Sequence, residues 1–233
     1  MINRRRSCIV FGLAVALIAA SWATPAGAQG PSAAQVAKPV TLPDIAIGSA
    51  KAPVTITEYA SMSCPHCAAW GENVFPMLRS RYIDTGKVRF VFREFPLDLK
   101  AAGASMVARC IAKGDSEKYL AVVETMYKQL DPLIARTRET LTLIGKLNGM
   151  SEPEVAACAT DQAMLDKLKA DGQYALTTLK VVSTPTFFVN GQMLKGAATI
   201  EAETGHSRLR SELVLRIHRL WSCRLLRIVC GES

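Results

Sequence analysis

The sequence predicts an α/β domain interrupted by an all-helical insertion, and three patterns support this fold class. Residues 54–60 are β-branched and apolar, as in a buried strand, and apolar residues at helical spacing follow them. Between residues 100 and 180 the patterns are helical only. Asn190-Gly191 then separates two short apolar runs, which is a strong signal for a β-hairpin.

The N-terminus has the three parts of a secretory signal peptide. Asn3-Arg4-Arg5-Arg6 is a positive region, residues 8–20 are a short apolar core, and Ala26-Gly27-Ala28 supplies small residues for cleavage. We therefore expect cleavage after Ala28 and a mature chain that begins at Gln29. The apolar core is too short for a convincing membrane span.

The positive charge of the chain is concentrated at its two ends. The formal net charge is +8, with three arginines in the signal peptide and a net +3 in residues 203–233, which leaves +2 for residues 29–202. Because no clustered basic and aromatic face is evident, nucleic acid is not an expected partner. Residues 29–40 are rich in Ala, Pro, Gln and Ser, and we expect this segment to be flexible.

Two cysteines lie between the first strand and the helix that follows, in Cys64-Pro65-His66-Cys67. The helical pattern runs from Cys67 to Tyr82 and ends near Asp84-Thr85-Gly86. This places Cys64 at a helix N-terminus, where unpaired N–H groups and the helix dipole favour a thiolate. A thiolate attacks disulfides and leaves from them, so the pair predicts a redox site.

The remaining elements follow from alternation and from turn residues. Residues 87–94 alternate like a strand, which ends before Pro96. Ser151 and Glu154 form the capping pattern of a helix start. Residues 186–189 and 192–195 are the two hairpin strands. The helical region is broken at Gly114-Asp115, Asp131-Pro132, Asn148-Gly149 and Asp171-Gly172.

The order strand, helix, strand, helical insertion and hairpin resembles the DsbA family of exported thiol–disulfide oxidoreductases. The resemblance rests on Cys64-Pro65-His66-Cys67, on Glu58 six residues before Cys64, and on Thr184-Pro185 before the hairpin. It implies a thioredoxin fold formed by residues 41–98 and 181–202, with an inserted helical domain at residues 99–180.

The resemblance also implies roles for these residues. Cys64 would be the attacking and leaving sulfur, Cys67 the shielded partner that resolves the mixed disulfide, and His66 a partner that stabilises the Cys64 thiolate. Glu58 would exchange a proton with Cys67, although a solvent-facing strand position is the alternative. Thr184-Pro185 is expected to be a cis peptide that exposes the Thr184 backbone to an extended polypeptide. The Cys64–Cys67 disulfide is the redox group, so we expect no other cofactor.

The cysteines have other interpretations. Cys64 and Cys67 could form half of a zinc site, but zinc typically needs a second closely spaced pair of ligands, and the other cysteines do not supply one. We therefore expect no metal. Cys110 and Cys158 lie on different predicted helices. In an exported protein such cysteines usually pair, so we expect a structural disulfide, with buried free thiols as the alternative.

Residues 203–233 differ in composition from the rest of the chain. They contain six arginines and no lysine, whereas residues 29–202 contain twelve lysines and seven arginines. A frameshift in the coding sequence would explain this change. The competing interpretation is a basic amphipathic helix that covers the sheet or lies on an anionic membrane. Its apolar face would comprise Leu209, Leu213, Ile217, Leu220 and Ile228.

Taken together, these patterns predict an exported, periplasmic monomer that donates its Cys64–Cys67 disulfide to reduced exported polypeptides. By resemblance, a quinone-linked membrane thiol oxidase would restore the disulfide. A disulfide isomerase or reductase is the enzymatic alternative, and Thr184 before Pro185 is compatible with it. Residues 29–41 are too short for the dimerisation domain that isomerases usually carry. Outside enzymes, the alternative is a metal-binding or chaperone-like module.

Overall fold

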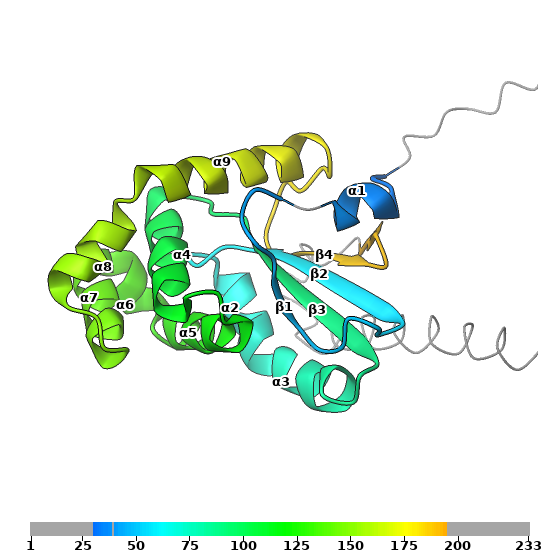
Figure 1. Ribbon diagram of the computed structural model, residues 1–233, viewed down its shortest axis with the longest axis horizontal. Helices are drawn as coiled ribbons and strands as arrows, with labels where there is room; N and C mark the ends of the chain where they lie inside the picture. Colours follow the sequence, from blue (N-terminus) through cyan, green and yellow to red (C-terminus); the bar gives the residue numbers. More distant parts are fainter. Residues whose placement is uncertain (1–29, 39, 195–233) are drawn as a thin grey trace, which may run out of the picture.

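The computed structural model describes residues 30–38 and 40–194, so the expected signal peptide and the 203–233 tail lie outside the described residues. The strands form one mixed sheet in the order β1-β3-β2-β4-β5 (Figure 1). The central strand β2 is parallel to β3 and antiparallel to β4. The strands are β1 (Ile45–Ile47), β2 (Val54–Ala60), β3 (Val88–Glu94), β4 (Thr186–Val189) and β5 (Gln192–Met193).

The helices divide between the sheet domain and an insertion between β3 and β4. The first group is α1 (Ala33–Ala37), α2 (Pro65–Asn73), α3 (Phe75–Leu78) and the π-helical segment η1 (Arg79–Ile83). The insertion contains α4 (Leu99–Ala112), α5 (Ser116–Lys128), α6 (Leu130–Ala135), α7 (Thr137–Leu147), α8 (Glu152–Ala159) and α9 (Gln162–Thr177). From β2 onward, the predicted order of strand, helix, strand, helical insertion and hairpin is therefore confirmed.

Side-chain caps fix where the inserted helices begin. The carboxylates of Asp98, Asp115 and Asp161 accept hydrogen bonds from backbone N–H groups in the first turns of α4, α5 and α9. Such caps satisfy donors that have no partner inside the helix. The predicted capping box of Ser151 and Glu154 is present at the start of α8.

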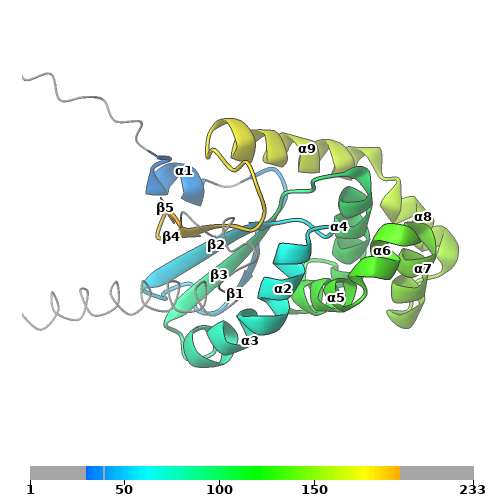
Figure 2. The ribbon, with the colours of Figure 1, turned by 180° about the vertical axis from the view of Figure 1, so that it is seen from behind.

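The two faces of the sheet pack against different helices (Figures 1 and 2). Val54, Ile56 and Ala60 of β2 belong to the main core with residues of α2, α4 and α5. Tyr59 belongs to a second core with residues of α1, β4 and the end of α9. Because successive strand residues point to opposite faces, Glu58 lies on the α2 side of the sheet.

The N-terminal segment differs from the flexible one expected at residues 29–40. Residues 33–37 form α1, and Val36 is only 3% exposed. The buried guanidinium of Arg93 donates to the backbone carbonyls of Val36 and Lys38 and pairs with Asp44. These contacts tie the segment to the sheet, and composition alone gave no sign of them. Strand β1 was also not predicted.

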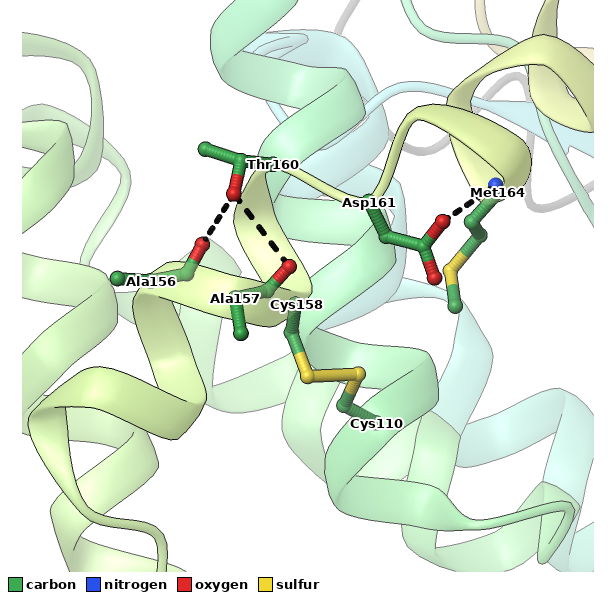
Figure 3. The surroundings of a disulfide bond; sticks show 7 residues. All are labelled: Cys110, Ala156, Ala157, Cys158, Thr160, Asp161 and Met164. Atoms are coloured by element: carbon green, nitrogen blue, oxygen red, sulfur yellow. Dashed lines mark hydrogen bonds between the residues drawn. A yellow bond between two sulfur atoms is a disulfide. The ribbon is translucent and has the colours of Figure 1, made fainter.

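The insertion is cross-linked internally. The expected disulfide between Cys110 of α4 and Cys158 of α8 is present (Figure 3). It lies beside the turn in which Asp161 caps α9 (Figure 3). Within the described residues, no helix is long and apolar enough to cross a lipid bilayer.

The disulfide gives a stability prediction. It closes a loop across 48 residues, so the Cys110→Ser/Cys158→Ser variant should lose up to about 4 kcal/mol of unfolding free energy, because its unfolded chain has more conformational freedom. Urea unfolding measures the loss, with Cys64 and Cys67 alkylated in both proteins so that only one bridge differs. Equal unfolding free energies in the two proteins would contradict the prediction.

Candidate active site

The Cys64-Pro65-His66-Cys67 segment forms the start of α2. Strand β2 ends at Ala60, and after a short loop Cys64 is the N-cap residue of α2 with extended backbone geometry. The Cys67 backbone N–H donates to Cys64 Sγ at 3.4 Å. Pro65 occupies the first turn, where its missing N–H costs no helical hydrogen bond. The Cys64 sulfur thus takes the position that a capping oxygen usually occupies.

The two thiols have opposite electrostatic environments. A hydrogen bond from the Cys67 thiol is the largest cause that lowers the pKa of Cys64, from its ordinary 9.0 to about 6, despite opposing desolvation. Burial raises the pKa of Cys67 well above its ordinary value, and the hydrogen bond to Cys64 adds to this rise. Both cysteines are free, and Cys67 is completely buried. The arrangement favours a thiolate on Cys64 and a protonated thiol on Cys67.

His66 contributes through its backbone rather than through the contact expected of its side chain. Its side chain is exposed. The backbone N–H groups of Cys67 and His66 both help to lower the pKa of Cys64. Among the described residues, no hydrogen bond joins the imidazole to Cys64, so the thiolate is stabilised chiefly by Cys67 and by the helix N-terminus.

Thr184 and Pro185 lie opposite the cysteines. Their peptide bond is cis, and both residues are buried. The Cys64 thiol donates to the Thr184 carbonyl oxygen at 3.3 Å. The Thr184 side chain also helps to lower the pKa of Cys64. The structure thus brings residues 120 positions apart into contact.

Glu58 lies beneath the cysteines on the central strand. Its neighbours in the sheet are Phe92 of β3 and Phe187 of β4, and it is only 2% exposed. Burial raises its pKa well above the ordinary value, and the negative charge of Cys64 raises it further. No hydrogen bond to its carboxyl group is found among the described residues. The solvent-facing alternative for Glu58 is therefore wrong.

Tyr127 of α5 is a residue of the site that the sequence analysis missed. Its hydroxyl donates to the Ser61 carbonyl oxygen at 3.3 Å, in the loop before Cys64. Burial raises the pKa of this phenol well above its ordinary value, and the charges of Cys67, Glu58 and Cys64 add to the rise. Its ring lies against Gly71 of α2, where an added Cβ would be 3.3 Å away. No local motif marks Tyr127, because the contact depends on how the insertion packs.

Comparison with known proteins places this site in a family. A family model of thioredoxin matches residues 41–205. The chain belongs to the thioredoxin family. The crystal structure of Wolbachia pipientis alpha-DsbA1 aligns with a TM-score of 0.68 and 26% identity, over 84% of this chain and all of that one. The thioredoxin fold with a DsbA-like helical insertion, expected from the sequence, is thus confirmed.

Curated relatives of this thioredoxin-family chain include two named for disulfide chemistry. A Rickettsia bellii protein named as a protein-disulfide oxidoreductase is 36% identical over 150 residues, which are 64% of this chain and 57% of the relative. The Bacillus subtilis disulfide bond formation protein D is 24% identical over 65% of this chain and 70% of its own length. The chain thus spans little more than half the length of the Rickettsia relative.

The described part of the chain was expected to hold no metal site. There, no group of three or more His, Cys, Asp or Glu side chains has the arrangement of a metal site.

The contact between the thiols can be tested by two substitutions at one position. Cys67→Ala should raise the pKa of Cys64 above about 6, because the variant lacks the hydrogen bond that lowers this pKa most. Cys67→Ser is the matched control, since its hydroxyl still donates at this position. The rate of Cys64 alkylation against pH, followed by peptide mass, measures both. The same midpoint in wild type and Cys67→Ala would contradict the assignment.

Proposed function

We propose that this protein is an exported thiol–disulfide oxidoreductase that passes its Cys64–Cys67 disulfide to reduced, newly exported polypeptides. The proposal rests on the pKa values of the two thiols, which are shifted in opposite directions. The pKa of Cys64 is lowered to about 6, whereas burial raises that of Cys67. A low thiol pKa makes Cys64 a good leaving group, and it stabilises the reduced enzyme relative to the disulfide.

The reaction follows two exchanges. A substrate thiolate attacks Cys64 Sγ of the enzyme disulfide, the sulfur–sulfur bond breaks, and Cys67 leaves with the electron pair. A second substrate thiolate then attacks the substrate sulfur of the mixed disulfide, and Cys64 leaves as a stable thiolate. The substrate dithiol is oxidised by two electrons and the enzyme is reduced by two. The backbone at Thr184 and Pro185, which lies beside Cys64 Sγ, would align the substrate in an extended form.

Glu58 is positioned to exchange a proton with Cys67. A buried thiolate is costly, so Cys67 needs a proton as it leaves. Glu58 lies close enough for its charge to raise the pKa of Cys67, and its own raised pKa keeps a proton available at higher pH than an ordinary carboxyl group would. We assign Glu58 the role of general acid in this direction and of general base in the reverse one.

Export and reoxidation complete the proposal. The signal-peptide pattern of residues 1–28 supports transport to the periplasm, where substrates are oxidised after export. The enzyme would act as a monomer. A quinone-linked membrane thiol oxidase would return Cys64 and Cys67 to the disulfide. The relatives named for disulfide formation support this class of reaction.

The redox equilibrium with glutathione tests the direction of transfer. A thiol pKa of about 6 lies between about 7 in thioredoxin and about 3.5 in strongly oxidising DsbA. We therefore expect a potential between those of the two proteins, about −270 and −120 mV. Thiol trapping and mass measurement of the Cys64–Cys67 pair give the value. A potential at or below that of thioredoxin would overturn the oxidase proposal and favour reduction or isomerisation, with which Thr184 is compatible.

Substitution of the buried acid tests the proton step. Glu58→Gln should slow oxidation of a dithiol peptide by roughly 100-fold, because Cys67 then leaves without a proton donor. The wild-type rate should fall as pH rises through the raised pKa of Glu58, and the variant should lack this fall. Stopped-flow mixing at several pH values measures both. Glu72→Gln on the exposed side of α2 is the control, and an unchanged profile in Glu58→Gln would contradict the role.

A further inference from the structure

A cavity of about 300 Å³ lies beneath the active-site helix. It is enclosed by α2 and the start of α3 on one side, by α5 on another, and by β2 and β3 at its base. Its wall is largely apolar and aromatic, with Trp70, Phe75, Phe90 and Phe92 among the lining residues. The volume is within the range typical of small-molecule sites. Thr184 and Pro185 are not among its lining residues, so it is separate from the proposed polypeptide site.

The polar groups of the cavity are unevenly distributed. Glu58 lies at the inner wall, is 2% exposed, and has no hydrogen bond to its carboxyl group among the described residues. At the exposed rim, Lys128 pairs with Glu124 at 2.6 Å, and Glu72 adds a further carboxylate. Lys128 is the only lysine among the described lining residues, and it is already paired at the rim. The inner carboxyl group faces an aromatic space to which the described residues bring no unpaired cation.

We propose that this cavity binds a small organic cation with a flat apolar body, whose ammonium group meets the Glu58 carboxylate. Aromatic faces attract cations and also bury an apolar ring. An ammonium donor would give the buried carboxylate the partner that a buried charge needs. The acidic rim disfavours anions. A bare metal ion would find one carboxylate and aromatic walls, which is a poor set of ligands.

Binding of this cation is coupled to protonation. The titratable groups around Glu58 are Cys64 and Cys67 at the start of α2, Glu72 further along α2, and Glu124, Lys128 and the phenol of Tyr127 on α5. Its neighbours in the sheet are apolar. Because burial favours the protonated form of Glu58 and raises its pKa, a bound ammonium would displace a proton from it. Affinity for the cation should therefore rise with pH.

Binding is also coupled to the redox state, a consequence that rests on the proposed function. The Cys64 thiolate of the reduced protein adds negative charge near Glu58, and the disulfide form lacks this charge. Where Glu58 is ionised, the cation should therefore bind the dithiol form more tightly than the disulfide form. By reciprocity, a bound cation makes the protein a stronger oxidant. Direct binding measurements do not depend on oxidase activity, so failure of the proposed function would leave the site testable.

Isothermal titration calorimetry of the whole protein with tryptamine and with tryptophol tests the site. The two probes share the indole ring, and tryptophol carries a neutral hydroxyl in place of the ammonium. Tryptamine should bind the dithiol form at least about tenfold more tightly than tryptophol does, the difference expected for a hydrogen bond to a charged group. Titration in two buffers of different ionisation enthalpy should show proton release when tryptamine binds but not when tryptophol binds.

Variants locate the binding. Glu58→Gln should remove the preference for tryptamine and the proton release, with tryptophol binding kept within about twofold. Glu117→Gln is the matched control, because Glu117 lies on α5 outside the cavity and pairs with Arg79. Absence of tryptamine binding at millimolar concentration, equal affinity for both probes, or an unchanged preference in Glu58→Gln would each overturn the proposal. The wild-type comparison of the two probes stands even where a variant fails to fold.

Discussion

The central position of β2 is the constraint on which the site depends. The strand is parallel to β3 and antiparallel to β4, and both of its faces are covered. Its C-terminal end delivers Cys64 to the start of α2, while the pairing of Tyr59 with Thr186 brings Thr184 and Pro185 to the same edge. A slip of one residue in this register would turn Glu58 to the α1 side of the sheet and separate it from Cys67.

Burial acts on three acids of the site, but hydrogen bonding decides the outcome at only one of them. Burial raises the pKa values of Glu58 and Cys67, whereas the pKa of Cys64 is lowered from its ordinary 9.0 to about 6. A helix dipole alone lowers a thiol pKa by at most about 1.5. The remaining stabilisation of the thiolate needs donors, and the Cys67 thiol is the largest. Each cysteine thus sets the pKa of the other, and the pair functions as a unit.

The sequence predicted what short-range patterns encode. The strand before Cys64, the helix after it, the helical insertion and the Asn190-Gly191 hairpin are all local signals, and each is present in the structure. Cys64 at the N-terminus of α2 followed from spacing alone. The face occupied by Glu58 did not, because alternation places Glu58 on the face of Val54 and Ile56 whereas its charge favours solvent. The backbone role of His66 was also hidden, since a residue type reports on its side chain only.

Long-range packing accounts for the features that the sequence could not show. Helix α1 has a capping box of Ser32 and Gln35, but five residues make a weak helix without tertiary contacts. Its stability in the fold comes from Arg93, 57 residues away from Val36. Tyr127 reaches Ser61 across 66 residues. Neither contact has a periodic or motif signature in the sequence.

The helical insertion is therefore part of the reactive centre as well as an addition to the fold. Helix α5 supplies Tyr127 to the loop before Cys64 and forms one wall of the cavity beneath α2. A sheet with only α2 on this face would leave Glu58 and Cys67 open to water, which would return their pKa values toward ordinary ones. The insertion shields the Glu58 carboxyl group and the Cys67 sulfur from water. This burial raises the pKa of Cys67 and so gives it a different role from that of Cys64.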